Sequence, residues 1–236
     1  MDRTEPSMPG GFFALRTDAV PGGAHRPLAD LYAGDLGPLT ARVDTVAARL
    51  RTPERRVAAS IAQLGLAARL WSVALGHAAL FGRLPDLSPD RFFWDPAHTS
   101  PDDLWLSGTD TLPGTAEGIR EAVQFGHLVP LAAAMRAEGT ISERLLWGNA
   151  GSALGGAVRE LATWARAHGR PEAAERARTL AAELFGHPDL RSTGTPHGPA
   201  FRRRSCCLYY RCPDGGLCGD CVFDRRPGAA KGVAPG

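Results

Sequence analysis

Apolar residues recur with helical spacing through most of the chain between residues 36 and 190. A Thr-Pro pair at residues 52–53 is a helix start signal, and TISE at residues 140–143 has the pattern of a capping box, whose hydroxyl and carboxylate satisfy free backbone amides. Pro130 predicts a kink in one helix. The pattern predicts helices over residues 38–50, 52–82, 115–139, 142–168 and 171–185.

The helical pattern breaks over residues 84–114, where turn-rich stretches flank the short aromatic pieces RFFW and LWL. Two short strands or a long structured loop fit this insertion. The fold class is therefore mainly α: a helical body with a short β/loop insertion and a small C-terminal segment. The expected divisions are an irregular lead-in at 1–35, the body at 36–190, a linker at 191–200, the C-terminal segment at 201–225 and a flexible tail at 226–236.

The net charge of +2 is too small to indicate a nucleic-acid partner or an anionic membrane surface. The first 20 residues lack a continuous apolar run, so no secretory signal is expected and the predicted location is the cytoplasm. Residues 61–82 are the longest apolar stretch, but Arg69 lies within it, and an arginine at the centre of a membrane span costs about 2.5–3.5 kcal/mol. We expect a buried helix there and no transmembrane span; peripheral membrane association stays open.

All five cysteines lie in one short window, SCCLYYRCPDGGLCGDC, at residues 205–221. Disulfides require an oxidising compartment, which nothing in the sequence supports. A structural zinc site usually has two C-x-x-C pairs, and only one is present. A [2Fe-2S] centre shares four thiolates between two irons, which suits adjacent cysteines better, because their side chains point to opposite sides of an extended segment unless the backbone turns sharply. The spacing alone favours a cluster and leaves zinc open.

This window resembles the C-terminal segment of the FhuF-like ferric-siderophore reductases, whose pattern is two adjacent cysteines, ten residues, a cysteine, two residues and a cysteine. LWGNAGS at residues 146–152 resembles the Trp-Gly-Asn and Ser stretch in the helical part of that family. The resemblance covers residues 94–221. It implies that a [2Fe-2S] cluster is held by Cys206, Cys207, Cys218 and Cys221, while Cys212 falls outside the pattern.

The resemblance further implies an oxidoreductase that acts on metal ions. It would dock a ferric siderophore on the helical body and reduce its Fe(III) by one outer-sphere electron, so that Fe(II) is released in the cytoplasm. The sequence has no evident P-loop, catalytic triad, NAD site or flavin site, so the electron donor is expected to be external, a ferredoxin or a flavin reductase. Two alternatives remain: a zinc-stapled helical interaction protein, and an iron-sulfur carrier or sensor without a siderophore site.

Several other residues are candidates for contacts with the substrate or a partner. Arg202, Arg203 and Arg204 precede the cysteine pair and could raise the cluster potential or receive an anionic partner. Trp147, Asn149 and Ser152 could line a chelate pocket; alternatively, Trp147 lies in the core and Asn149 faces solvent. The glycines of residues 148–156 lack nucleotide-loop spacing and predict close helix packing. The expected structural or exposed histidines are His77, His127 and His197.

Overall fold

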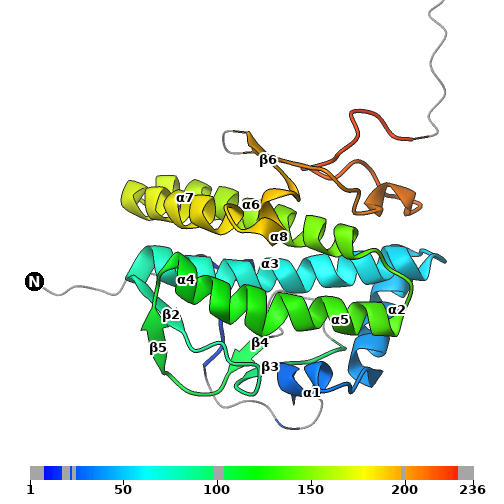
Figure 1. Ribbon diagram of the computed structural model, residues 1–236, viewed down its shortest axis with the longest axis horizontal. Helices are drawn as coiled ribbons and strands as arrows, with labels where there is room; N and C mark the ends of the chain where they lie inside the picture. The colour runs from blue at the N-terminus through cyan, green and yellow to red at the C-terminus, as the bar shows by residue number, and fades with distance from the viewer. Residues whose placement is uncertain (1–7, 18–21, 23–24, 98–103, 198–199, 228–236) are drawn as a thin grey trace, which may run out of the picture.

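The computed structural model describes residues 8–17, 22, 25–97, 104–197 and 200–227. Its long helices agree with the helical periodicity, and the mainly α fold class is confirmed. Helices α6 and α7 form one layer, α3 lies beneath them, and the segment from α4 to α5 lies on the far side of α3 (Figure 1). The long helices are α2 (Gly37–Leu50), α3 (Arg55–Phe81), α6 (Glu143–Ala167) and α7 (Pro171–Phe185).

Helix α3 is the centre of the core, and it packs against α2, α6 and α7. Of the described helices it is the one long and apolar enough to cross a membrane, but 72% of its apolar window is buried inside the protein. Arg69 is buried within it and donates hydrogen bonds to the carbonyls of Gly11 and Phe12, at 3.1 and 2.7 Å. A helix that is apolar all round is typical of the interior of a large domain, as expected for this stretch.

The helix predicted over residues 115–139 is divided into three parts: α4 (Ala116–Ile119), the π-helical η2 (Arg120–Leu128) and α5 (Val129–Glu138). The irregularity therefore lies before Pro130, which sits in the first turn of α5 directly after the π-helical η2. The predicted capping box is wrong. Helix α6 begins at Glu143 after Ser142, no side chain caps it, and Glu143 pairs instead with Arg136 at 2.9 Å.

His127 lies on η2 and is completely buried. Its Nε2 donates to the carbonyl of Leu87 at 2.6 Å, which leaves Nδ1 as the acceptor for the Tyr32 hydroxyl at 2.9 Å. Burial lowers the pKa of His127 to about 4, although the hydrogen bond to Leu87 opposes the shift. His77 likewise bonds to the carbonyl of Val73, so both histidines are structural, while the side chain of His197 lies outside the described residues.

The pKa of His127 predicts an acid-sensitive fold. The unfolded chain protonates this imidazole below about pH 6.5, whereas the folded protein resists protonation until about pH 4, so stability is lost as the pH falls through this window. We expect the free energy of unfolding to fall by about 2 kcal/mol from this residue between pH 7 and pH 5. Denaturant unfolding at both pH values measures this fall. His127→Gln should lose this part of the pH dependence. An equal fall in the free energy of unfolding of both proteins would contradict the prediction.

The insertion between α3 and α4 contains short strands. Strands β3 (Phe92–Trp94) and β4 (Leu104–Leu106) pair antiparallel, and β1 (Arg26–Pro27) extends them in the order β1-β3-β4. A second ladder joins β2 (Arg83–Pro85) to β5 (Thr111–Pro113). The segment expected as an irregular lead-in also contains ordered pieces, η1 (Gly11–Phe13) and α1 (Leu28–Tyr32).

The segment expected as a linker at residues 191–200 forms half of a hairpin. Strand β6 (Gly194–His197) follows the short helix α8 (Pro188–Arg191) and pairs antiparallel with β7 (Ala200–Arg203). The hairpin and the cysteine segment lie over α6, and the short helix η3 (Tyr209–Arg211) reaches over the first turns of α3 (Figure 1). The cysteine window is thus docked on the helical body. Most of the expected tail, residues 228–236, lies outside the described residues.

Candidate metal centre

The two adjacent cysteines sit at a sharp turn. Leu208 has a left-handed backbone with φ of 69°, and its amide donates a hydrogen bond to the sulfur of Cys206 at 3.3 Å. Such a conformation costs a bulky residue about 1–2 kcal/mol, so surrounding contacts must hold it. One of these contacts is the Ser60 hydroxyl on α3, which donates to the carbonyl of Cys207 at 2.8 Å. The turn is the feature that two neighbouring cysteines need in order to serve one centre.

The C-x-x-C pair closes the other side of the site. The amide of Cys221 donates to the carbonyl of Cys218 at 3.0 Å, and the amide of Phe223 donates to the sulfur of Cys221 at 3.4 Å. Each cysteine pair therefore has one sulfur that accepts a hydrogen bond from the amide two residues later. Such bonds stabilise negative charge on sulfur and suit thiolate ligands of a metal.

The four cysteines of the two pairs share one neighbourhood. A hydrogen bond from the thiol of Cys218 lowers the pKa of Cys207, and the same bond raises the pKa of Cys218. Cys206 interacts electrostatically with Cys207 and Cys221, and burial raises its pKa. Among the described residues, no three His, Cys, Asp or Glu side chains converge at the distances of a single-ion site. Cys212 is also buried, which raises its pKa, and it interacts with Cys207.

Asn149 on α6 does not line a pocket, and the alternative that it faces solvent is wrong as well. It is completely buried, and its amide donates to the carbonyl and hydroxyl of Ser60 at 2.9 and 3.2 Å. Its side-chain oxygen accepts a hydrogen bond from Nη2 of Arg203. Asn149 therefore connects α3, α6 and the start of the cysteine segment in one buried polar network.

Ser152 on α6 holds the C-x-x-C loop in place. Its hydroxyl donates to the buried carboxylate of Asp220 at 2.6 Å, and Arg159 donates to the same carboxylate at 3.2 Å. The carbonyl of Asp220 accepts from the amide of Arg203 at 3.0 Å. Ser152 thus positions the loop between Cys218 and Cys221.

Three of the four glycines of α6 lie against Thr193, the hairpin and the start of the cysteine segment and do not serve close packing with another helix, contrary to the prediction. A Cβ atom at Gly148 would lie 3.2 Å from Cβ of Ser205, and one at Gly155 would lie 2.8 Å from Cβ of Phe201. At Gly151 it would lie 2.9 Å from Cβ of Thr193. These three glycines, which we call the glycine strip, follow one face of the helix. They let the hairpin and the cysteine segment approach the backbone of α6.

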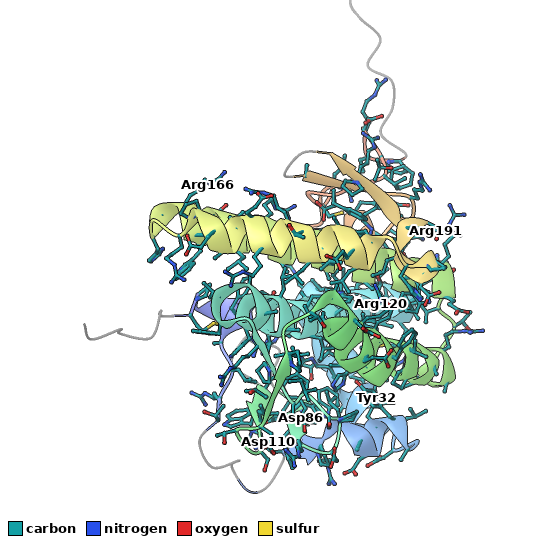
Figure 2. All side chains as sticks on the ribbon, turned by 60° about the vertical axis from the view of Figure 1, so that its left-hand side comes forward. Tyr32, Asp86, Asp110, Arg120, Arg166 and Arg191 are labelled. Atoms are coloured by element: carbon teal, nitrogen blue, oxygen red, sulfur yellow. The ribbon has the colours of Figure 1, made fainter. Side chains whose placement is uncertain are left out.

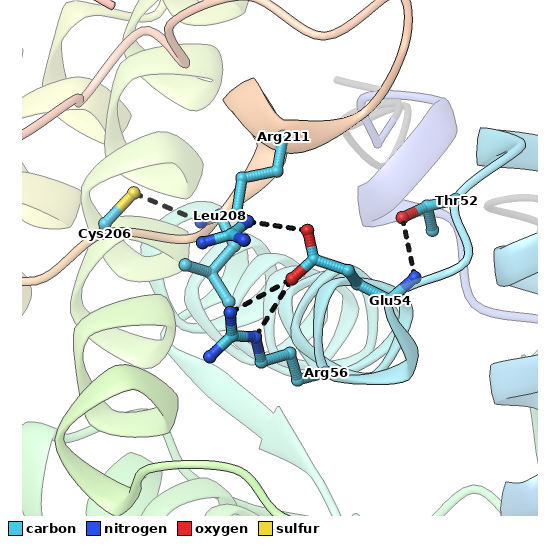
Figure 3. Close-up of polar contacts among 6 residues, drawn as sticks. All are labelled: Thr52, Glu54, Arg56, Cys206, Leu208 and Arg211. Carbon is cyan, nitrogen blue, oxygen red and sulfur yellow. Dashed lines mark hydrogen bonds and ion pairs between the residues drawn. The ribbon is translucent and has the colours of Figure 1, made fainter. Parts of the chain in front are cut away.

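Ion pairs at the surface fix η3 over the start of α3 (Figure 3). Nε of Arg211 donates to Glu54 at 2.7 Å, and Arg56 donates to the other oxygen of that carboxylate at 3.0 Å. The hydrogen bond from Arg211 lowers the pKa of Glu54. Exposed pairs of this kind contribute little stability, so their main effect is to orient the segment.

A groove opens beside the cysteine pair. A cavity of about 310 Å³ is lined by Cys206, Arg144, Arg204 and Phe223, and a neighbouring cavity of about 620 Å³ is lined by the same two arginines together with Trp147. Arg144 also donates to the carbonyl of Arg204 at 3.2 Å. Trp147 is half-buried; it packs on the core and also lines the larger cavity.

The three arginines before the cysteine pair lie in different places. Arg204 is exposed on the groove, and Arg202 is exposed and pairs with Asp224 at 2.7 Å. Arg203 is only 2% exposed, so its charge lies inside the protein rather than on the outer surface. Ser60, Arg144 and Asp220 are not among the site residues predicted from the sequence. Asp220 was signalled by its place between two cysteines, whereas the distant Ser60 and Arg144 carry no local signal.

Two family models match this chain. Residues 203–223 match the FhuF 2Fe-2S C-terminal domain, and residues 100–196 match the family described as ferric iron reductase FhuF-like transporter. The search of curated proteins finds no match. The first match identifies the cofactor as a [2Fe-2S] cluster.

The side chains and amides at the cysteine window fit such a cluster. The amides of Leu208 and Phe223 already donate to sulfur atoms, and Nη1 of Arg203 is buried without a hydrogen-bond partner. Positive and N–H donor groups around thiolate sulfur are the surroundings that stabilise an anionic iron-sulfur centre.

Proposed function

This chain belongs to the family of FhuF-like ferric iron reductases, and from that membership we propose that it reduces siderophore-bound Fe(III) by one electron in the groove beside Cys206. The observation that carries the proposal is the position of Cys206, which is half-buried and lines a cavity that shares Arg144 and Arg204 with the larger one. A chelate in this groove would lie against one of the proposed ligands. The proposed recognition body is residues 36–190, and the cluster segment is residues 201–225.

The four proposed ligands are Cys206, Cys207, Cys218 and Cys221. When bound, the cluster supplies one electron at a time. The turn at Leu208 presents both cysteines of the first pair, and the amides of Leu208 and Phe223 stabilise charge on the ligand sulfurs. Ser60 and Ser152 hold the two halves of the segment against α3 and α6.

The groove has the chemistry to hold a ferric chelate. Siderophores bind Fe(III) through hard oxygen donors, and the guanidinium groups of Arg144 and Arg204 can donate to those oxygens. Trp147 supplies an apolar wall. Because Fe(II) is a softer ion that such oxygen donors bind less tightly, the transfer of one electron loosens the iron for release. The electron comes from an external donor, a ferredoxin or a flavin reductase, and the proposed location is the cytoplasm.

The proposal is tested by an anaerobic titration. The protein is reduced with dithionite, freed of excess reductant and mixed with ferric siderophores while the visible spectrum reports reoxidation and ferrozine traps Fe(II). We expect one Fe(II) for each reduced cluster. A protein that takes up and returns electrons to a dye but is not reoxidised by any ferric chelate would be an electron carrier or sensor, which contradicts the proposal.

The groove arginines should control chelate affinity. In Arg144→Gln and Arg204→Gln, the chelate concentration for half-maximal reoxidation rate should rise about tenfold, because each loses a charge-assisted hydrogen bond. Arg166→Gln is the matched control, since Arg166 is exposed near the end of α6 remote from the cysteine segment (Figure 2). If the chelate concentration for half-maximal reoxidation rate is the same in all three variants as in the unmodified protein, the chelate binds outside this groove.

A further inference from the structure

Arg203 is a buried cation at the start of the cysteine segment. Its Nε donates to the carbonyl of Ser205 at 2.9 Å, its Nη2 donates to the amide oxygen of Asn149, and its Nη1 is buried without a hydrogen bond. No carboxylate among the described residues forms an ion pair with it; the nearby carboxylate of Asp220 is bound by Ser152 and Arg159. A buried charge is costly unless an opposite charge lies close to it.

Cysteines lie around this charge, and the Arg203 side chain lines a cavity together with Cys218 and Asp220. Arg203 interacts electrostatically with Cys206, Cys207 and Cys218, which are three of the four proposed ligands. Its backbone amide also binds the carbonyl of Asp220 in the C-x-x-C loop, so the residue touches both halves of the cysteine window. The guanidinium is therefore held beside the position where the anionic cluster would lie.

We propose that Arg203 is the internal counter-charge of the cluster and raises its reduction potential. This inference rests on the ligand set of the proposed function. Four thiolates, two sulfides and two ferric ions sum to a charge of about −2, and one added electron makes it about −3. A fixed positive charge stabilises the more negative state more strongly, and burial keeps that interaction from being screened by water and salt.

Asn149 positions this charge without cancelling it. As a neutral amide it accepts a hydrogen bond from Arg203 through its oxygen and, through its nitrogen, binds Ser60, which in turn holds the carbonyl of Cys207. An aspartate has nearly the same shape, but it would pair with the guanidinium and place a negative charge in the site. The choice of an amide at this position therefore matters to the redox chemistry and not only to packing.

The test is a set of reduction potentials, which needs no siderophore. The purified full-length variants are titrated with dithionite and mediators while absorbance and the EPR signal of the reduced state are followed. Arg203→Gln and Asn149→Asp should each shift the one-electron equilibrium at least tenfold toward the oxidised state, which corresponds to about 59 mV. Arg203→Lys keeps the charge, and Arg202→Gln removes an exposed, paired arginine. In both variants the one-electron equilibrium constant should stay within about threefold of that of the unmodified protein.

Each outcome decides the proposal. Unchanged potentials in iron-loaded Arg203→Gln and Asn149→Asp would overturn it, since a merely structural role moves stability and loading but not the potential. If those two variants hold no iron, the charge-retaining Arg203→Lys decides. Arg203→Lys that retains its iron with an unchanged potential supports the counter-charge. Arg203→Lys that also loses its iron overturns the proposal, because the shape of arginine rather than its charge would then be required. None of these outcomes depends on chelate reduction, so a failure of the proposed function is seen separately.

Discussion

Replacing any one of Cys206, Cys207, Cys218 and Cys221 with serine should remove most of the iron and acid-labile sulfide from the purified protein. Loss of residues that merely support metal ligands already costs about 10- to 100-fold in affinity, and loss of a ligand itself should cost at least as much. The visible absorption and the reduction of ferric chelates should fall with the iron content. Iron and sulfide assays on anaerobically purified protein give the measurement.

Cys212 provides the matched control for this series, because it is buried in the same window and lies outside the family pattern. Cys212→Ser should keep its iron, its sulfide and its spectrum. If Cys212→Ser loses the cluster while one of the other four serine variants keeps it, the ligand set proposed for this chain is incorrect. A colourless protein that holds one zinc would reject the cluster altogether.

Adding a methyl group to the glycine strip should release the cysteine segment from the helical body. In Gly151→Ala the new Cβ would lie 2.9 Å from Cβ of Thr193 and 3.2 Å from Cζ of Phe201, so both residues must shift. Overpacking of this kind costs about 1–3 kcal/mol, and here it falls on the hairpin that carries the first cysteine pair. We expect a lower free energy of unfolding together with reduced cluster content.

Gly156 lies on the same helix and shows what the substitution does without the clash. A Cβ there would meet only the flexible end of Arg159, at 3.7 Å. Gly156→Ala should therefore stabilise the protein by about 0.5–1 kcal/mol through helix propensity and leave the iron content unchanged. Denaturant unfolding and iron assays on the two variants should give opposite signs for stability. A stabilised, fully loaded Gly151→Ala would show that the hairpin does not need close approach to α6.

The helices were predictable because their signals are local. The spacing of apolar residues and the Pro and Gly punctuation gave α2, α3, α6 and α7 nearly to their ends, as expected where pattern and propensity agree. The errors lay where a local signal competes with longer-range contacts. The capping-box pattern at residues 140–143 forms no cap, because α6 begins at Glu143 itself and this residue is not in the third helical position that a capping box needs. The glycines of α6 gave no sign of whether a helix or a hairpin would cover them.

The candidate site divides in the same way. The cysteine spacing favoured a cluster over zinc, and its resemblance to the FhuF-like pattern implied the [2Fe-2S] type, because ligands within a short window can converge through local turns alone. The roles of the polar residues around it depended on burial, which arises only when α3, α6 and the hairpin meet. Arg202, Arg203 and Arg204 are identical in type and adjacent in sequence, yet one is buried, one forms a surface ion pair and one lines the groove.

The sequence by itself therefore determined the helical architecture through its periodicity, and it indicated the family and the cofactor through the resemblance of one short cysteine motif to the FhuF-like pattern. The tertiary structure alone decided that Asn149 and Ser152 support the cysteine segment, that Ser60 reaches Cys207 from α3, and that the charge of Arg203 is buried beside the thiols. The physical reason is that the strength of a charge or a hydrogen bond depends on its exclusion from water, and exclusion is a property of elements packed together rather than of any stretch of the chain.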